Sequence, residues 1–533
     1  MAIILTGICT ELDDPFEKAV QTARKQLKVR TKDILSAYPV KSSIDARHPE
    51  KIKIVYAVGI ELAGNEEAVL RRANLSNASL RRSGTLELSF GTRPMVHRPV
   101  IAGFGPAGMF AALLLAQQGY RPLILERGMD VDRRVQAVES FWKSGVLDPK
   151  TNVQFGEGGA GTFSDGKLTT RIHDPRCGYV MEQLTCFGAP AQTMRRAKPH
   201  IGTDKLRGVV KNIRREIERL GGEIKFGVQV EDLLVYQGKL AGLIADGQPI
   251  ACDQLVLAVG HSARDTFAVL HTMGLPLECK PFSVGFRAEH LQTEIEKSLY
   301  HGAAGNPALP RGEYQLSQHV EKRCVYTFCM CPGGQVVASA SEKGRVVTNG
   351  MSYHARSGRN ANAAVVVSVG GEDFGNDPRK AIAFQRELEA RAYAAGRPGG
   401  EYAAPAENIQ SFLEGRGQLK ISRVQPTYDR GVCPADLGAL LPGELADTLR
   451  AGLRAYERKI AGYTAPEAIL TGLETRTSSP VRLKREENFE CAQLAGLYPC
   501  GEGAGYAGGI MSAAVDGLRV ARAIISRYAP AEG

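Results

Sequence analysis

Residues 100–108 read Val-Ile-Ala-Gly-Phe-Gly-Pro-Ala-Gly, an apolar run that passes directly into a glycine turn. The segment predicts a strand followed by a helix over residues 109–118. In such a unit Gly103 permits the tight turn, Gly105 lets the backbone approach a pyrophosphate, and Gly108 lets the helix lie close against the strand. The helix N-terminus then faces the negative phosphates. The stretch predicts a doubly wound α/β domain that binds a dinucleotide.

The residues that follow support this reading. A second apolar run, Pro122–Leu125, ends in Glu126, whose carboxylate is placed to accept hydrogen bonds from ribose hydroxyls. The same glycine spacing recurs at residues 156–161 and 503–508, but neither copy has the full strand, helix, strand and acid context. The first copy is therefore the dinucleotide turn.

The end of the chain distinguishes FAD from NAD. Residues 497–503 form an expected strand that ends in Gly-Glu, and residues 508–514 open a helix that reaches Arg522. The N-terminus of that helix can stabilise the negative charge that develops on the N1–C2=O edge of a flavin during reduction. The apolar run Leu255–Val259 before Gly260 adds a buried parallel strand. These elements predict non-covalently bound FAD and an oxidoreductase.

The rest of the 533 residues divides by pattern. We expect a small N-terminal α+β domain at 1–95, a discontinuous Rossmann-like FAD domain at 96–275 and 471–533, and an inserted α+β substrate or cap domain at 276–470. Eleven scattered cysteines indicate reduced thiols in a cytoplasmic protein. The apolar runs are too short to span a membrane.

The order of these pieces resembles the glutathione-reductase-type FAD fold. More closely, the chain resembles a largely uncharacterised family of bacterial FAD-dependent dehydrogenases. The segments that carry this likeness are residues 103–108, 154–167, 260–265, 328–334, 349–352, 474–480 and 501–517. The resemblance implies FAD and a redox role, and it implies no particular substrate.

Candidate site residues follow from these segments. The expected cofactor contacts are Gly103, Gly105, Pro106, Ala107, Gly108, Glu126, Arg127, Gly159, Ala160, Val230, Gly260, Gly501, Glu502, Gly508, Gly509 and Ile510. The expected catalytic residues are Lys167, Glu474 and Arg476. Lys167 would place a cation near the flavin N5 or a substrate carboxylate, and the other two would share one side of a strand. Arg287, Glu289 and His290, like His354 and Arg356, favour surface ion-pair groups.

Cysteine chemistry is not favoured by the spacing. Flavin disulfide reductases use a closely spaced pair, and the chain has no Cys-x-x-Cys or Cys-x₄-Cys. Cys329 and Cys331 would point the same way from a strand, but two ligands do not make a metal site, so no metal is expected. A second dinucleotide domain is also missing from the pattern. NADH or NADPH as electron donor would therefore dock transiently in the cleft.

Two other functions stay open. Lys41, Arg47, Lys51 and Lys53 lie on or beside an expected hairpin in the basic N-terminal region, which would suit an RNA-modifying flavoprotein. No aromatic stacking set accompanies them, so a nucleic-acid partner is not favoured over a small-molecule substrate. A flavin-binding interaction or sensor protein without turnover is the other alternative.

Overall fold

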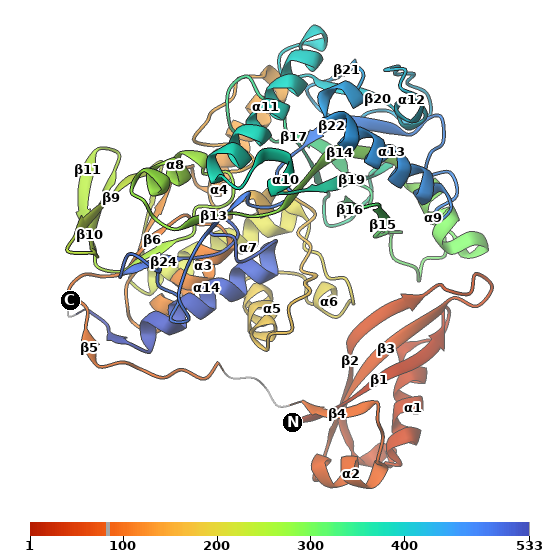
Figure 1. Ribbon diagram of the computed structural model, residues 1–533. Helices are drawn as coiled ribbons and strands as arrows, with labels where there is room; N and C mark the ends of the chain where they lie inside the picture. The colour runs from red at the N-terminus through yellow and green to blue at the C-terminus, as the bar shows by residue number, and fades with distance from the viewer. Residues whose placement is uncertain (82–85, 532–533) are drawn as a thin grey trace.

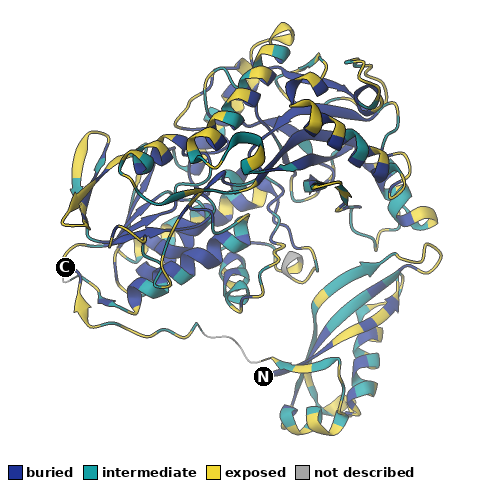
Figure 2. Ribbon diagram, viewed as in Figure 1, coloured by how far each residue is buried: buried dark blue, intermediate teal, exposed yellow. Residues whose placement is uncertain are grey.

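The computed structural model describes residues 1–81 and 86–531. Figure 1 shows a small N-terminal domain beside a larger body in which two sheets lie at opposite ends. The Ser42 N–H of the small domain donates to the carbonyl oxygen of Arg195, and the Ala197 N–H donates to that of Ser42. The buried residues of the body gather along these two sheets and the helices against them (Figure 2). A mixed α/β fold, as the sequence predicts, is confirmed.

The sheet that follows the opening motif has five strands, all parallel, in the order β24-β12-β6-β7-β8. Its strands are β6 (Val100–Ala102), β7 (Leu123–Glu126), β8 (Glu223–Phe226), β12 (Leu255–Leu257) and β24 (Leu497–Pro499). Chain order and spatial order differ, so β6 lies in the middle and the C-terminal strand β24 returns to one edge. Strand order reverses beside β6, which is where ligands bind in sheets of this kind.

Helices cover one face of this sheet and a β-meander lies on its other side. The helices that pack together are α3 (Pro106–Gln117), α7 (Thr203–Arg219) and α14 (Ile510–Ile525). In α3 every residue from Ala107 to Ala116 is buried, so this helix is held on all sides. The meander is β9 (Val230–Tyr236), β10 (Lys239–Ala245) and β11 (Gln248–Ala251). Residues 223–226, which precede the meander, are β8, because they pair in parallel with β7.

The second sheet has seven strands in the order β15-β16-β19-β14-β22-β20-β21. They are β15 (Ser317–Val320), β16 (Arg323–Cys331), β19 (Asn360–Val369), β14 (Phe282–Leu291), β22 (Ile469–Glu474), β20 (Ala404–Asn408) and β21 (Val432–Pro434). Every residue of β14 and β22 is buried. The expected domain boundary at 470 falls inside β22, which pairs antiparallel with β14, so the inserted sheet continues past that boundary.

The remaining elements complete the body. Around the seven-stranded sheet lie α9 (Gln292–Tyr300), α10 (Gly371–Phe374), α11 (Pro378–Gly396), α12 (Ile409–Glu414) and α13 (Gly443–Glu457). Elsewhere are α4 (Val131–Ser144), α5 (Arg176–Cys186), α6 (Ala191–Met194), α8 (Arg264–Thr272), and the short strands β5 (Arg93–Pro94), β13 (Leu277–Cys279), β17 (Gln335–Ala338), β18 (Thr348–Met351), β23 (Val481–Leu483) and β25 (Tyr528–Ala529).

The N-terminal domain is a four-stranded antiparallel sheet, in the order β2-β3-β1-β4, with both its helices on one face. Its elements are β1 (Ala2–Glu11), α1 (Phe16–Leu27), β2 (Ile34–Asp45), β3 (Lys53–Leu62), α2 (Glu66–Ala73) and β4 (Ala78–Arg81). On the central strand β3, Tyr56 packs against Phe16 of α1, whereas Gly59 contacts Tyr38 on the open face. The central strands β1 and β3 therefore present no aromatic pair for stacking bases.

Candidate functional site

A single large cavity lies between the two sheets of the body. Its volume is about 1370 Å³, larger than the roughly 300–1,000 Å³ of an ordinary small-molecule pocket. The residues that follow the C-terminal ends of β6, β12 and β24 line one end: Gly103, Gly260 and Glu502. Most residues of the segments 164–172 and 324–330 line the other end. The cavity thus begins at the switch point of the parallel sheet.

The glycines of the opening motif have distinct environments. A Cβ on Gly108 would stand 2.0 Å from the carbonyl oxygen of Gly103, so this glycine lets α3 pack against the turn. A Cβ on Gly103 would stand 2.4 Å from the carbonyl oxygen of Ala258. At Gly105 the nearest atom to an added Cβ is the Cα of Gly159, at 3.6 Å. Gly105 and Gly159 line the cavity and Gly108 does not, so only part of the motif faces a ligand.

Glu126 joins three glycine-rich segments. One carboxylate oxygen accepts from the backbone N–H of Phe104 at 2.8 Å. The other accepts from the N–H groups of Gly128 at 2.9 Å and Gly156 at 3.0 Å. The residue is 5% exposed and lines the cavity. Glu126 therefore fixes the shape of the loops, in addition to the ribose contact that its position in the motif predicts.

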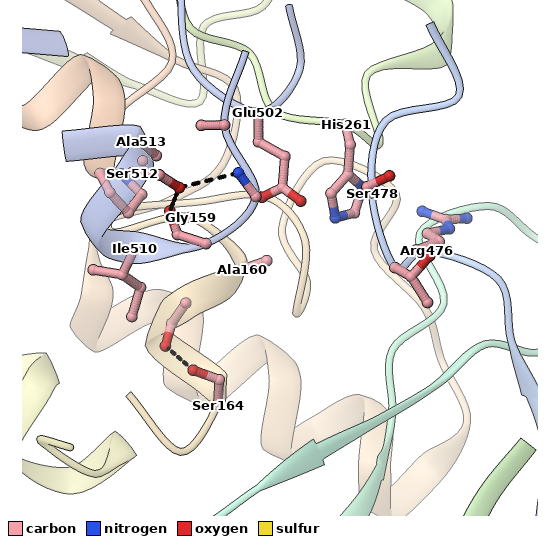
Figure 3. Close-up of a pocket in the computed structure, with 18 of the residues that line it drawn as sticks. Gly159, Ala160, Ser164, His261, Arg476, Ser478, Glu502, Ile510, Ser512 and Ala513 are labelled. Carbon is pink, nitrogen blue, oxygen red and sulfur yellow. Dashed lines mark hydrogen bonds between the residues drawn. The ribbon is translucent and has the colours of Figure 1, made fainter. Parts of the chain in front are cut away.

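The C-terminal return brings a second helix N-terminus to the cavity. Gly508, Gly509 and Ile510 line it where α14 begins. The Ser512 hydroxyl accepts from the N–H of Gly508 at 3.1 Å and lies 3.2 Å from the carbonyl oxygen of Gly509 (Figure 3). This bond ties the turn to the first turn of the helix. An added Cβ would meet nothing within 4 Å at either glycine, so the approach to the helix N-terminus is open.

Glu502 points into the space between this turn and the opposite wall (Figure 3). Burial raises the pKa of its carboxyl to about 7, and the positive charge of Lys280 partly opposes the rise. Gly501, also expected to contact the cofactor, lies behind the wall: its N–H donates to Asp516 at 2.8 Å, and an added Cβ would stand 2.6 Å from that of Ala107. Gly501 and Gly108 therefore shape the site without lining it.

The cradle fits the pyrophosphate and ribose of FAD. The N-terminus of α3 starts at Gly105 and that of α14 at Gly509, and no side chain stands at either position. Free N–H groups at helix N-termini bind anions without a counter-charged side chain. The remaining expected contacts Pro106, Ala107, Arg127, Ala160 and Val230 line the same cavity.

Arg476 belongs to a buried charged network rather than to a free wall. Its guanidinium bonds to Glu389 at 3.2 Å through both Nε and Nη2, and Nη1 donates to the Ser262 hydroxyl at 3.0 Å. Arg264 holds the same carboxylate at 2.7 and 2.9 Å. The two guanidinium groups keep the pKa of Glu389 far below its usual range in spite of burial. Arg476 is thus held rigidly at the edge of the cavity.

His261 lies beside this network, and Figure 3 shows it between Glu502 and Arg476. Burial lowers the pKa of its imidazole to about 3, and the nearby Arg476 and Arg264 add to the shift. The ring is therefore neutral at physiological pH. Its Nδ1 lies 3.0 Å from the hydroxyl of Ser262, whose oxygen is also 3.2 Å from the side-chain oxygen of Gln154.

Glu474 ends β22 and is not a free acid. Arg287 donates to its two oxygens at 3.1 and 2.7 Å, and the pair is buried. Burial raises the pKa of the Glu474 carboxyl, opposed by Arg287. Arg476 lies beyond the strand end, so strand alternation does not place the two residues together as we expected. Both still line the cavity.

The expectation of surface ion pairs at Arg287, Glu289 and His290 is wrong. The three residues lie on the fully buried strand β14. Glu289 accepts from Asn360 at 3.0 Å, and His290 is 2.7 Å from the carbonyl oxygen of Tyr463. Their sequence alternates apolar and charged residues like a half-exposed strand. That polar face is nevertheless covered, because the segments that hold Asn349 and Thr427 lie over Arg287 and Glu289, while β19 and β22 pair with the two edges of β14.

Lys167 lines the cavity and forms an ion pair with Glu313, a carboxylate that Lys198 also contacts. Its Nζ lies 3.5 Å from Glu313, and Lys198 reaches the other oxygen of that carboxylate at 3.0 Å. Arg356, also expected on the surface, is 5% exposed and pairs with Asp165 and Glu313. His354 stacks on His200, with ring centroids 5.4 Å apart. The far end of the cavity therefore holds a cationic group, formed by Lys167, Lys198 and Arg356 around their shared acid Glu313.

Several cavity residues were not singled out by the sequence: Gln154, His261, Ser262, Lys280 and Ser478. Gln154 and the pair His261-Ser262 lie inside two of the segments that carry the family resemblance. The signal was therefore present in those segments, but nothing in their spacing marked a side chain that would face a ligand. Lys280 donates to the Ser478 hydroxyl at 3.2 Å from a segment without any motif.

Comparison with known proteins places the chain. Residues 281–477 match the family described as FAD-dependent protein, C-terminal domain-like. A protein of Clostridium beijerinckii, described as uncharacterized, is 46% identical over 532 residues, which cover 99% of each chain. The chain belongs to the same family as that protein. The match to this domain model supports FAD as the cofactor.

Solved structures give a much weaker likeness. L-amino acid deaminase from Proteus vulgaris is 11% identical, covers 84% of this chain and 98% of its own, and has a TM-score of 0.33. Glycine oxidase from Bacillus cereus is 10% identical, covers 80% of this chain and 96% of its own, and has a TM-score of 0.30. These values are too low to carry an argument about this chain.

Among the described residues, no helix is long and apolar enough to cross a membrane.

Proposed function

We propose that the protein is an FAD-dependent oxidoreductase that acts on a small-molecule substrate. The observation that carries the proposal is the continuity of the cavity. One cavity is lined by the glycine cradle at Gly105 and Gly509, by Glu502 beside that cradle, and by the cationic side chains of Lys167 and Arg476. A bound FAD would accept or donate a hydride at N5. The polar end of the cavity then lies next to the place where a substrate would meet it.

The residues of this chain have three tasks in that reaction. The helix N-termini at Gly105 and Gly509 bind the negative charge of the cofactor. Arg476 cannot swing away, because Glu389 and Ser262 hold it, so it keeps one orientation toward the cavity. Glu502 has a pKa of about 7 and can therefore hold or release a proton at neutral pH.

Lys167 would orient an anionic substrate. Its only carboxylate partner among the described residues is Glu313, which it shares with Lys198 and Arg356. Arg356 also pairs with Asp165, so two acids balance three bases, and the remaining positive charge favours a carboxylate or a similar anion.

The proposal is tested by anaerobic reduction of the purified holoprotein. NADH, NADPH and a panel of small carboxylates are mixed with it separately while the flavin absorbance is recorded. We expect fast bleaching with at least one donor, and a slower rate in Lys167→Met with little change in FAD content. Arg171→Met is the matched control, because Arg171 also lines the cavity but has no ion pair among the described residues. Slow reduction by every donor would contradict an enzyme and favour the sensor alternative.

A further inference from the structure

Cys329 and Cys331 lie in the wall of the cavity, in a part of β16 that departs from regular strand geometry. Pairing with β19 shifts between Phe328 and Cys331, so the strand has a bulge there. Cys329 has a φ of 44°, a left-handed value that residues with side chains rarely adopt. Bulges change the direction of side chains and are common beside active sites. The regular alternation that would place both thiols on one face is therefore absent.

The bulge brings the two cysteines together. The Sγ of Cys331 is 3.3 Å from the carbonyl oxygen of Cys329, so the second thiol folds back toward the first residue. Cys329 lines the cavity, whereas Cys331 is completely buried behind it. One thiol is thus accessible to a ligand in the cavity and the other is reached only through its neighbour. That arrangement suits an attacking thiol and a resolving thiol.

The surroundings stabilise a thiolate at the accessible position. The neighbouring Cys331 thiol and the positive charges of Arg287 and Lys167 lower the pKa of Cys329, against the effect of burial. Arg287 also donates to the Cys329 carbonyl oxygen at 2.9 Å, which fixes the backbone of the bulge. The pKa of Cys331 is raised, because its neighbour and burial both disfavour its charged form. A difference of this kind within a pair is typical of redox-active cysteines.

We infer that Cys329 and Cys331 form a redox-active dithiol/disulfide pair that exchanges two electrons with the bound FAD. This inference rests on the proposed function, because oxidised FAD is the electron acceptor. In the oxidising direction both S–H bonds break and one S–S bond forms. The two thiols lose two electrons and two protons, and the flavin gains them. In the reverse direction the S–S bond breaks, the thiols take up two protons, and the flavin is oxidised.

Thiol labelling of the holoprotein tests the inference without an activity assay. Air-oxidised protein and protein reduced by a small thiol are alkylated under denaturing conditions, and the cysteine peptides are quantified by mass spectrometry. We expect the peptide that holds both residues to be unlabelled in the oxidised protein and doubly labelled in the reduced protein. Anaerobic titration with dithionite should then require about twice the electron equivalents that the flavin alone consumes.

Cysteine variants separate this pair from the other thiols. Cys329→Ser and Cys331→Ala should each return the titration to the requirement of the flavin alone. Cys324→Ser is the matched control, because Cys324 also lies on β16 and lines the cavity, and it should titrate like the parent. Equal labelling in both states of a protein that holds FAD would overturn the inference and leave the proposed function intact. Absence of any flavin spectrum would overturn both.

Discussion

Replacement of Gly105 by alanine separates cofactor binding from folding. The residue has φ −79° and ψ −176°, values that alanine adopts without strain. An added Cβ would be 3.6 Å from its nearest neighbour, the Cα of Gly159, so the methyl group fits the FAD-free protein. A Gly→Ala change at a compatible site stabilises a protein by about 0.4–1 kcal/mol. The FAD-free Gly105→Ala variant should therefore be as stable as the parent or slightly more so.

Binding of FAD should respond in the opposite direction. The methyl group would stand in the cavity where the pyrophosphate approaches the helix N-terminus. Loss of one hydrogen bond to a charged group costs about 1.5–3 kcal/mol. Since about 1.4 kcal/mol corresponds to a tenfold change, the Kd for FAD should rise about 10- to 150-fold. Titration of the FAD-free protein, followed by flavin fluorescence, measures this change directly.

Gly108→Ala is the control, because its added Cβ would be 2.0 Å from the carbonyl oxygen of Gly103. That overlap with backbone should lower the free energy of unfolding by about 1–3 kcal/mol even without FAD. Chemical denaturation of the two FAD-free variants compares them. If Gly105→Ala bound FAD as tightly as the parent, or unfolded as readily as Gly108→Ala, the assignment of Gly105 to the pyrophosphate would be refuted.

Three further predictions concern buried charges. Glu126→Ala should destabilise the FAD-free protein by at least about 3 kcal/mol, because three backbone N–H groups lose their acceptor. An unchanged denaturation midpoint would show that the loops keep their shape without this carboxylate. Glu474→Leu should lower the free energy of unfolding by about 3–5 kcal/mol, because it leaves Arg287 buried without its partner. In the same denaturation assay, adding Arg287→Met should recover part of that loss. A double variant no more stable than Glu474→Leu would argue against this explanation. In the folded protein, burial raises the pKa of Glu502 from its usual value of 4.5 to about 7, so the folded state binds this proton more tightly than the unfolded state. The stabilising contribution of the proton is therefore lost as pH rises from about 4.5 to about 7. Relative to Glu502→Gln, the FAD-free parent should therefore lose stability across that range, and parallel pH curves for the two proteins would contradict the assignment.

The sequence predicts those parts of the fold that depend on the pattern of a short stretch of residues. The run from Val100 to Gly108 contains a strand, a turn and a helix start within one short segment, and the structure has all three there. The roles of the glycines in the turn can be predicted, because each glycine answers a local steric requirement. Glu126 was likewise placed by its distance from the turn. Its three backbone amide partners were not predicted, because they come from loops whose shapes depend on one another.

The polar end of the cavity depends on contacts between distant segments. Arg287 meets Glu474 across 187 residues of sequence, and Arg264 meets Glu389 across 125. No periodicity marks such pairs, since each half alone resembles an ordinary surface charge. The bulge at Cys329 is similar, because regular alternation is the only expectation that a strand-like sequence supports. Sequence therefore predicts the cradle far better than the chemistry beside it.

Quantification of flavin in the purified protein tests the central claim most directly. The protein is expressed without added cofactor, its absorbance spectrum is recorded, and the flavin released by denaturation is identified by mass spectrometry. We expect a yellow protein that releases FAD in an amount close to one molecule per chain. A colourless protein that does not take up FAD on reconstitution would contradict it.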